Sequence, residues 1–468
     1  MRSRRLSCFL CVFLLLAISV GGCNPAKQDL QKFNALYEKG CLDQTTFEKS
    51  VEFARAKMGK VEKPNAEDLL WAMQLGVLER TRQNYRQSSE YFDKAEEMLS
   101  YFDYQNKAVD SVAAIAISDN IIPYVGEEYD GIMVNTYKAL NFMSLSKDDL
   151  ARVEFNRAMD RQRRSKEKFA EQLQQVKNEI EKQKGKQKTL VKKSVENPKV
   201  SNLIAKKYPG LSQFKAYPDF VNPFATYMAG VYFNLVGDHS KAVTLLKESC
   251  GMVSDNHYIA EDLAVTEQIL DGQAELKDTV WVVFENGLGP VRKEFRIDLP
   301  LFIVTNKVKY VGIALPKLVF RKEAYPYLSV ETSNDSYRTE LVADMDRVIQ
   351  TEFKEDFKGI LTRAIISATA KAVAQYALNE GGGSKLQLAS IGVAIFSFAT
   401  TAADVRIWTT LPKNFQVARL PIPDDRQITI SAPGWTLFNV NIPSCRNAVI
   451  YVKIPFKEAS PVYELIEY

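Results

Sequence analysis

The sequence predicts an α+β protein with a helical N-terminal part and a C-terminal part made of strands. From Asp29 to about Leu270, apolar residues recur at spacings of three and four, and Gly and Pro are sparse. Near Lys277 this pattern gives way to the alternation typical of strands. A chain of 468 residues is long enough for two or three domains with real cores. We therefore expect a helical repeat domain over residues 23–275 and an antiparallel β-sandwich over residues 276–468.

The first residues are typical of a bacterial lipoprotein signal peptide. Three arginines within the first five residues precede an apolar run, Phe9–Val20, which is too short to span a bilayer of ~30 Å as a helix. Two glycines and then Cys23 match the lipobox. We expect residues 1–22 to be removed and Cys23 to carry acyl chains such as palmitate on its sulfur and its amine. The alternative is an ordinary signal peptide followed by an incidental cysteine.

The residue after the lipidated cysteine indicates which membrane holds the protein. In lipoproteins of this type an Asp at that position often retains the protein in the inner membrane, and here the residue is Asn24. We therefore expect the periplasmic face of the outer membrane of a Gram-negative bacterium. Two acyl chains suffice for stable anchoring, so the membrane itself is the first expected partner.

Composition and charge exclude some classes of protein. Hydrophobic residues make up 46% and charged residues 25%, which are ordinary globular values. The formal charge is +4, and without the three signal arginines 58 basic residues face 57 acidic ones, or about +1. A nucleic-acid-binding protein is not expected. After processing, Cys41, Cys250 and Cys445 remain, so one disulfide at most can form.

Within the helical part the sequence contains a repeat signal of the tetratricopeptide (TPR) kind. In the clearest copy, Tyr227–Ser249, Gly230 and Ala242 are expected where two helices cross, and Gly237 in the turn between them. Two weaker copies contain Leu75, Gly76, Tyr85, Ser88, Phe92 and Ala95, and then Tyr137, Phe142, Ala151, Phe155 and Ala158. An irregular helical bundle is the alternative.

A basic helical arm, at about residues 160–207, separates the last two copies. Arg161–Lys207 contains 15 Lys or Arg against 5 Glu. We expect one helix extended from the preceding repeat, and a second half from about Thr189 to Ala205 that returns along it. The arm either touches anionic lipid or an acidic partner, or it is a solvated hairpin.

The C-terminal part divides into two groups of predicted strands. The first group is Thr279–Phe284, Glu294–Asp298, Val308–Ile313 and Tyr327–Glu331, and the second is Gln416–Arg419, Gln427–Ser431, Leu437–Asn441 and Ala448–Ile454. Their spacing suggests a sandwich.

A helical insertion at about residues 337–404 lies between these groups. We expect an amphipathic helix over Tyr337–Phe357 and two apolar helices over Ile360–Leu378 and Leu386–Asp404. The uncharged run Leu386–Ala403 is just long enough to span a membrane. A hairpin buried against the sandwich is favoured, because charges in the partner helix make insertion costly.

Catalytic motifs are largely missing from the sequence. Its two histidines, His239 and His257, lie in a predicted turn and loop, and no zinc-protease, hydrolase-elbow or phosphate-loop pattern is present. We expect no catalytic residues, no metal and no cofactor. An enzyme that uses carboxylates alone, such as a cell-wall hydrolase, stays as the least favoured alternative.

One stretch carries a resemblance to known proteins. Ala403–Pro421 includes Asp404, Arg406, Trp408 and Arg419, and it is supported by Phe284–Pro290, Arg296–Pro300 and Tyr137–Asn141. With these residues the chain resembles a family of uncharacterised bacterial TPR-like lipoproteins. The resemblance implies a cell-envelope role beside small lipoproteins similar to activators of penicillin-binding proteins. It implies no catalytic residues.

The residues of this stretch also have a physical interpretation. Asp404 and Arg406 can form an ion pair where an apolar helix ends, and Trp408 would bury a large ring at the joint to the next strand. That strand would end at Arg419. We interpret the stretch as a structural hinge first and as an interaction patch second.

Together these observations predict a lipid-anchored periplasmic binding or scaffold protein of the cell envelope. Binding and scaffolding is the leading function, its expected partners are other envelope proteins or lipoproteins, and regulation of peptidoglycan synthesis is one setting for it. The alternative is an accessory lipoprotein of a secretion or surface-export complex.

Overall fold

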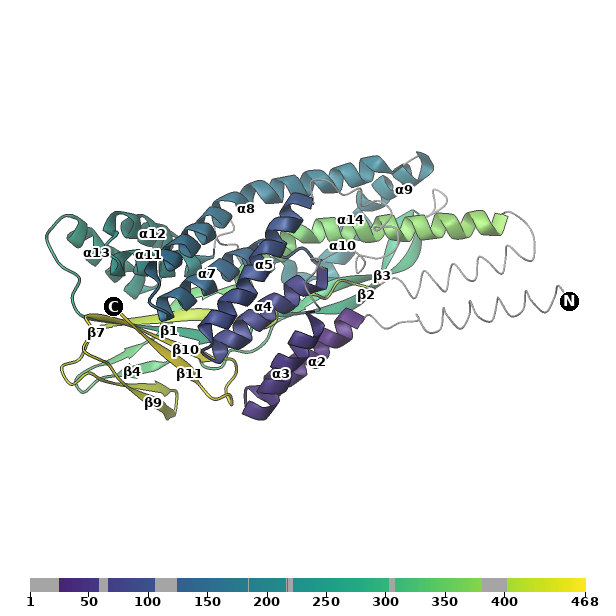
Figure 1. The fold of residues 1–468 in the computed structure, drawn as a ribbon. Coiled ribbons are helices and arrows are strands. Elements are labelled where there is room, and N and C mark those ends of the chain that lie inside the picture. The colour runs from purple at the N-terminus through teal and green to yellow at the C-terminus, as the bar shows by residue number, and fades with distance from the viewer. Residues whose placement is uncertain are drawn as a thin grey trace.

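The computed structural model describes residues 25–58, 66–105, 124–183, 185–215, 217, 222–302, 308–380 and 402–468. In these residues helices come first and strands follow, which gives a mixed α+β structure (Figure 1). The lipidation site Cys23, the apolar run Phe9–Val20 and most of the predicted helix Leu386–Asp404 lie outside the described residues. Among the helices described, none combines the length and the apolar character needed to cross a bilayer.

The N-terminal part consists mainly of antiparallel helical hairpins. They pair α2 (Pro25–Gly40) with α3 (Gln44–Lys57), α4 (Ala66–Thr81) with α5 (Tyr85–Gln105), α7 (Glu128–Ser144) with α8 (Asp148–Lys182), and α11 (Pro223–Leu235) with α12 (His239–Met252). The last helix of this part is α13 (His257–Leu270).

Three of the hairpins share one turn. Each has a residue with positive φ in its three-residue connection: Gln83 at 61°, Ser146 at 52° and Gly237 at 80°. The amide after it donates to a carbonyl five residues earlier, for example Asp238 to Phe233 at 2.8 Å. This hydrogen bond caps the first helix of the hairpin, as in a Schellman motif. The predicted turn at Gly237 is confirmed.

The same hairpins also share a close helix crossing. A Cβ added to Gly76 would lie 2.3 Å from the ring of Phe92, and one added to Gly230 would lie 3.0 Å from Leu246. Ala139 occupies the equivalent position of the α7–α8 hairpin and is fully buried. The hairpins therefore repeat one local design, although they do not follow one another at a fixed spacing of about 34 residues.

The arm continues from α8, as expected, and then returns. The return consists of α9 (Gly185–Val195) and α10 (Pro198–Lys207), followed by a short 3₁₀ turn, Pro209–Ser212. Its helices contact the strand β2 (Val291–Phe302) and the helix α14 (Met345–Glu380).

The strands form three sheets. The largest has the order β11-β10-β1-β7-β6, the second pairs β2 with β3, and the third has the order β5-β4-β8-β9. Besides β2, the strands are β1 (Thr279–Asn286), β3 (Val308–Val319), β4 (Ser329–Glu331), β5 (Ser336–Arg338), β6 (Glu340–Asp344), β7 (Asn414–Pro421), β8 (Gln427–Ala432), β9 (Trp435–Asn441), β10 (Asn447–Ile454) and β11 (Val462–Glu467). The expectation of antiparallel pairing is wrong for one pair, because β1 and β10 are parallel. Well over a hundred residues separate them, which is ample for the crossover that a parallel pair needs.

The prediction for the first part of the helical insertion is wrong. Tyr337–Asp344 does not begin a helix but lies in β5 and β6, where Glu340–Asp344 pairs with β7. The predicted break near Ile360 is also wrong, because α14 runs without interruption from Met345 to Glu380. Gly359 lies inside that helix, and a Cβ there would lie 3.1 Å from Val176 of α8. A helical Gly costs only ~1 kcal/mol, and here it lets two helices approach.

One hydrophobic core joins the helices to the sheets. All eight residues of β1 are buried, and Phe224 of α11 stacks on Phe415 of β7 with ring centroids 3.5 Å apart. Asp262 of α13 accepts hydrogen bonds from Trp281 of β1 at 3.1 Å and from Arg419 of β7 at 2.8 Å. The α11–α12 hairpin and α13 therefore pack directly against the five-stranded sheet.

A charged cleft between two hairpins

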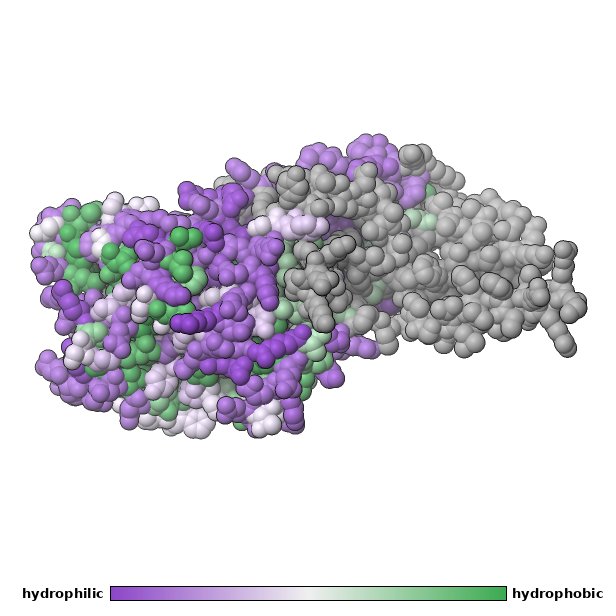
Figure 2. All heavy atoms as spheres, in the orientation of Figure 1, coloured by the Kyte–Doolittle hydropathy of each residue, from purple (hydrophilic) through white to green (hydrophobic). Residues whose placement is uncertain are grey.

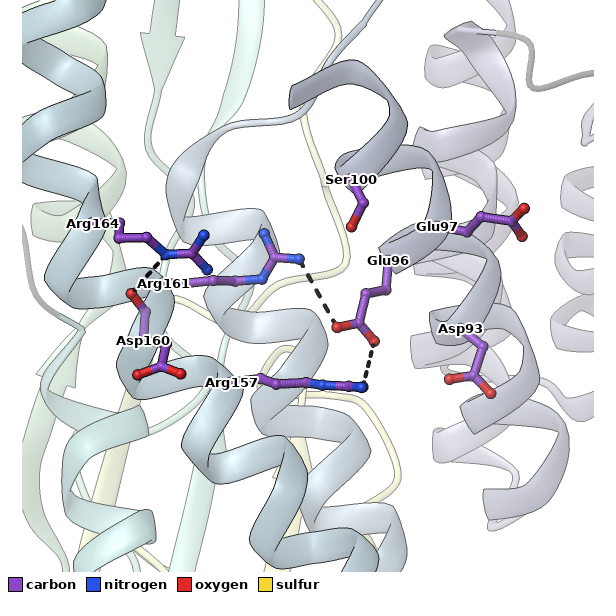
Figure 3. A pocket seen from close by; sticks show the side chains of 8 residues that line it. All are labelled: Asp93, Glu96, Glu97, Ser100, Arg157, Asp160, Arg161 and Arg164. Atoms are coloured by element: carbon purple, nitrogen blue, oxygen red, sulfur yellow. Dashed lines mark hydrogen bonds and ion pairs between the residues drawn. The ribbon is translucent and has the colours of Figure 1, made fainter. Parts of the chain in front are cut away.

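The candidate functional site is an open cleft of about 460 Å³ between α5 and α8 (Figure 3). The α5 wall carries acidic residues and one hydroxyl, whereas the α8 wall carries mainly arginines. The lining residues are Asp93, Glu96, Glu97, Ser100, Arg157, Asp160, Arg161 and Arg164.

The helical period places these residues on facing walls. On α5 they recur at positions 93, 96, 97 and 100, and on α8 at positions 157, 160, 161 and 164. Residues three and four apart lie on one face of a helix. The apolar neighbours Phe92 and Phe155 point away from the cleft-lining residues and are buried in the core. Each helix therefore packs on one side and faces the cleft on the other, with acidic residues on α5 and with three arginines and Asp160 on α8.

Lys138 of α7 forms the floor below the cleft and holds the acidic groups in place. Its buried ammonium lies 2.6 Å from Glu96, 2.8 Å from Asp93 and 2.9 Å from Glu154. Burial alone would lower the pKa of Lys138, but the nearby carboxylates outweigh it and raise the pKa. Burial would raise the pKa of Glu96, and its bonds with Lys138 lower it instead. Both groups therefore stay ionised.

Asn135 fixes the middle of the arginine wall. Its amide donates to Glu154 at 2.7 Å and to Glu96 at 3.1 Å, and its carbonyl accepts from Arg161 Nε at 2.8 Å. Gly131 leaves room for that arginine, because a Cβ there would lie 3.0 Å from the guanidinium. Arg161 is thus held by groups below the cleft, with its guanidinium 4.0 Å from Glu96.

Charge is distributed unevenly along the cleft. Arg157 contacts Glu96 at 3.3 Å and Glu154 at 2.8 Å, so the lower part is well balanced. Toward Ser100, the exposed Arg164 donates through Nε to the backbone oxygen of Asp160 at 3.3 Å (Figure 3). Near Ser100 the cleft therefore offers guanidinium groups and a hydroxyl to an anion, while Asp93 offers a carboxylate to a cation.

The residues singled out in the sequence lie elsewhere. Asp404 and Arg406 form the expected ion pair, with 2.7 Å between Oδ2 and the guanidinium. Trp408 is buried, and its ring lies about equally close to the rings of Phe92 and Tyr137, with centroids 6.0 and 6.1 Å away. Trp408 therefore packs the segment before β7 against the α4–α5 and α7–α8 hairpins.

Arg419 lies in a different part of the structure from Asp404, Arg406 and Trp408. It lies in β7 and is nearly buried, with ion pairs to Asp262 at 2.8 Å and to Glu261 at 2.5 Å. Burial raises the pKa of Asp262 to about 6, and the guanidinium of Arg419 opposes that rise. The structure therefore does not bring Asp404, Arg406, Trp408 and Arg419 together on one surface.

A second charged group, which we call the carboxylate junction, joins α7 to α14 and β2. Glu127, Glu352 and Asp356 bring their carboxylate oxygens within 4.8 Å of one another. Arg292 of β2 contacts Glu127 at 2.5 Å and its side chain is almost buried. Three carboxylates can hold a cation, but here a guanidinium already supplies positive charge.

The pKa values in the junction shift in the direction of protonation. Burial, followed by the charges of Glu127 and Asp356, raises the pKa of Glu352 well above its usual range. Burial and Glu127 do the same for Asp356. Asp130, which accepts hydrogen bonds from Tyr124 and from the Glu127 amide, has its pKa raised by burial to about 7.

The cysteines and histidines do not form a site in the described structure. Cys41, Cys250 and Cys445 are all free thiols. His239 Nδ1 lies 2.8 Å from Asn234 within its own hairpin, and His257 Nδ1 lies 2.7 Å from Glu340. Each histidine therefore supports a local connection.

The cleft was missed in the sequence because its residues resemble ordinary solvated helix faces. The available signal was the three-and-four spacing of like charges, acidic on one helix and basic on the other. Comparison with protein-family models, curated proteins and solved structures finds no match to this chain.

Proposed function

We propose that this protein is a lipid-anchored binding and scaffold protein of the bacterial cell envelope, and that the cleft between α5 and α8 binds a charged segment of a partner. The observation that carries the proposal is the pair of facing walls, acidic on α5 and basic on α8. A segment with both an acidic and a basic group would find a complement on each wall.

The way the cleft is built supports binding. Lys138 and Asn135 hold the carboxylates and Arg161 from below, so a ligand meets preorganised groups. Preorganisation lowers the entropic cost of binding. The lining contains one hydroxyl, Ser100, and neither His nor Cys, which gives little support to nucleophilic or acid–base chemistry.

The carboxylate junction gives less support to a hydrolase. Glu352 is buried and accepts hydrogen bonds from the backbone amides of Glu128 and Tyr129, and Glu127 is paired with Arg292. These contacts join elements of the fold. A carboxylate-based hydrolase therefore remains the less favoured alternative.

The same proposal includes the type of helical repeat, the lipid anchor and the cellular setting. The repeated hairpins are consistent with TPR-like units, which commonly present grooves to peptides. An acylated Cys23 would confine the cleft to the outer-membrane surface and raise its effective concentration near envelope partners. The resemblance to TPR-like lipoproteins favours peptidoglycan synthesis as the setting, with a secretion or surface-export complex as the alternative.

The test is site-specific photo-crosslinking in intact cells. A crosslinking residue would replace Ser100 at the cleft or, as the matched control, the exposed Thr244 on α12. Each form would be compared with its Cys23→Ala version. We expect Ser100 to yield a discrete envelope-protein adduct that is absent at Thr244 and reduced without the anchor. Identical adducts from both positions would contradict the cleft.

A further inference from the structure

The returning half of the basic arm, residues 185–207 and called the arm from here on, carries a large excess of positive charge. It contains seven lysines and one acidic residue, Glu196, whereas the chain without its signal arginines is nearly neutral at about +1. The excess of about +6 therefore belongs to α9 and α10. This excess charge would attract an anionic surface to these two helices.

The arm is fixed to the body of the protein and does not resemble a free polar hairpin. Leu190 and Val191 of α9 and Val200 and Ile204 of α10 are buried. Asn197 caps α10 by accepting from the Lys199 amide, and it donates to the Pro300 oxygen of β2, both at 3.1 Å. Contacts with β2 and α14 complete the support.

With the apolar side packed, the lysines face solvent. Lys192, Lys193, Lys199, Lys206 and Lys207 are all exposed. Lys188 pairs with Glu181 at the end of α8, whereas Lys199, Lys206 and Lys207 form no ion pair with any described residue. Figure 2 shows hydrophilic atoms along the edge where Figure 1 places α8 and α9.

The arm also lies toward the side from which the chain enters the fold. In Figure 1 the far end of α8, α9 and the far half of α14 project beyond the hairpins, and α2 begins on the side facing this projection. The proposed lipid on Cys23 is two residues before Pro25, the first residue of α2. A membrane holding that lipid would therefore be within reach of the arm.

We propose that the basic arm binds the anionic phospholipid headgroups of the membrane that holds the anchor. Lysines near an anionic bilayer surface each add to binding, and their effect decays within a Debye length. The arm and the lipid would together orient the cleft relative to the membrane. The inference rests on the proposed envelope location, but it does not depend on the cleft.

The experiment uses the full mature chain with Cys23→Ala, so that binding does not require the lipid. Co-sedimentation would compare vesicles of neutral phosphatidylcholine with vesicles that also contain phosphatidylglycerol. One variant carries Lys→Gln at positions 192, 193, 199, 206 and 207. The matched control carries five Lys→Gln substitutions at the exposed positions 39, 49, 277, 322 and 457.

We expect the parent and the control to bind the anionic vesicles. The arm variant should bind them at least about tenfold more weakly than the parent. Binding by the parent should weaken as salt rises from low to physiological concentration. Equal binding to neutral vesicles, equal loss in both variants, or no binding by the parent would overturn the proposal. Thermal unfolding of each variant shows whether it is folded, and the salt series on the parent tests the proposal without substitution. Loss of vesicle binding would leave the Ser100 crosslinks intact, so the two proposals can fail separately.

Discussion

The charged cleft and the carboxylate junction contain the same residue types but pair their charges differently. In the cleft, buried Lys138 is placed among three carboxylates, and Arg157 pairs with two of them, Glu96 and Glu154. In the junction, three carboxylates crowd together around the guanidinium of Arg292. Unlike charges keep each other ionised, whereas crowded like charges favour proton uptake.

This difference separates a site that can meet a ligand from one that holds the fold together. The cleft is open and its acidic and basic walls face each other, so their groups can exchange partners with an incoming segment. The carboxylate junction is largely buried, and protonation relieves part of the electrostatic repulsion among its three carboxylates. Three substitutions can test this contrast.

The largest expected effect is at the floor of the cleft. Lys138→Met should destabilise the fold by about 3–5 kcal/mol, because it leaves Glu154 and Glu96 without their buried cation. Urea unfolding would measure the loss. The double variant Lys138→Met with Glu154→Gln should recover part of it, and an equal loss in the single and double variants would show that packing, not charge, is responsible.

A smaller effect with the opposite sign is expected at the junction. Asp130→Asn should stabilise the protein by about 2 kcal/mol at pH 8. The rise of about three pKa units corresponds to ~4 kcal/mol, and an amide nitrogen at the buried Oδ1, which has no hydrogen-bond partner among the described residues, would offset ~2 kcal/mol of it. An acid whose pKa is raised from 3.8 to about 7 on folding costs stability when ionised. That cost falls as the pH decreases through 7 and vanishes below the unfolded value. The measurement is the difference in unfolding free energy between variant and parent from pH 8 to pH 4. A difference in unfolding free energy that does not change with pH would contradict the raised pKa of Asp130.

The smallest stability effect is expected at the outer end of the cleft. Arg164→Ala should change the free energy of unfolding by less than about 0.5 kcal/mol, because this arginine is exposed and its side chain bonds, among the described residues, to a backbone oxygen. The same variant should weaken the Ser100 crosslink severalfold. If the free energy of unfolding falls together with the crosslink yield, then Arg164 supports the fold and is not an anion-binding group of the cleft.

Local patterns in the sequence predicted much of the fold. Alternating apolar residues located β1 and β10, and the small residues Gly76 and Gly230 marked real helix crossings. The ion pair of Asp404 with Arg406 and the burial of Trp408 were expected from their position between two elements. In each case the signal lies within about twenty residues.

Features that depend on distant residues were not predicted. The parallel pairing of β1 with β10 joins the first strand to the next-to-last, and no local pattern records it. Glu340–Asp344 has spacing compatible with a helix, but pairing with β7 decides its conformation. Within the uninterrupted α14, Gly359 packs closely against Val176 of α8, which is far away in the sequence. The cleft likewise arises when α5 and α8, from different hairpins, meet over Lys138.

Binding of a partner segment by the opposite charges of α5 and α8 can be tested by one crosslinking measurement. The yield of the Ser100 photo-crosslink in intact cells would be compared between the parent and an Arg161→Glu, Arg164→Glu variant, with Lys49→Glu, Lys457→Glu as the control of equal charge change. We predict that the adduct disappears in the cleft variant and persists in the control. An unchanged adduct in the cleft variant, or an equal loss in both, would contradict the claim.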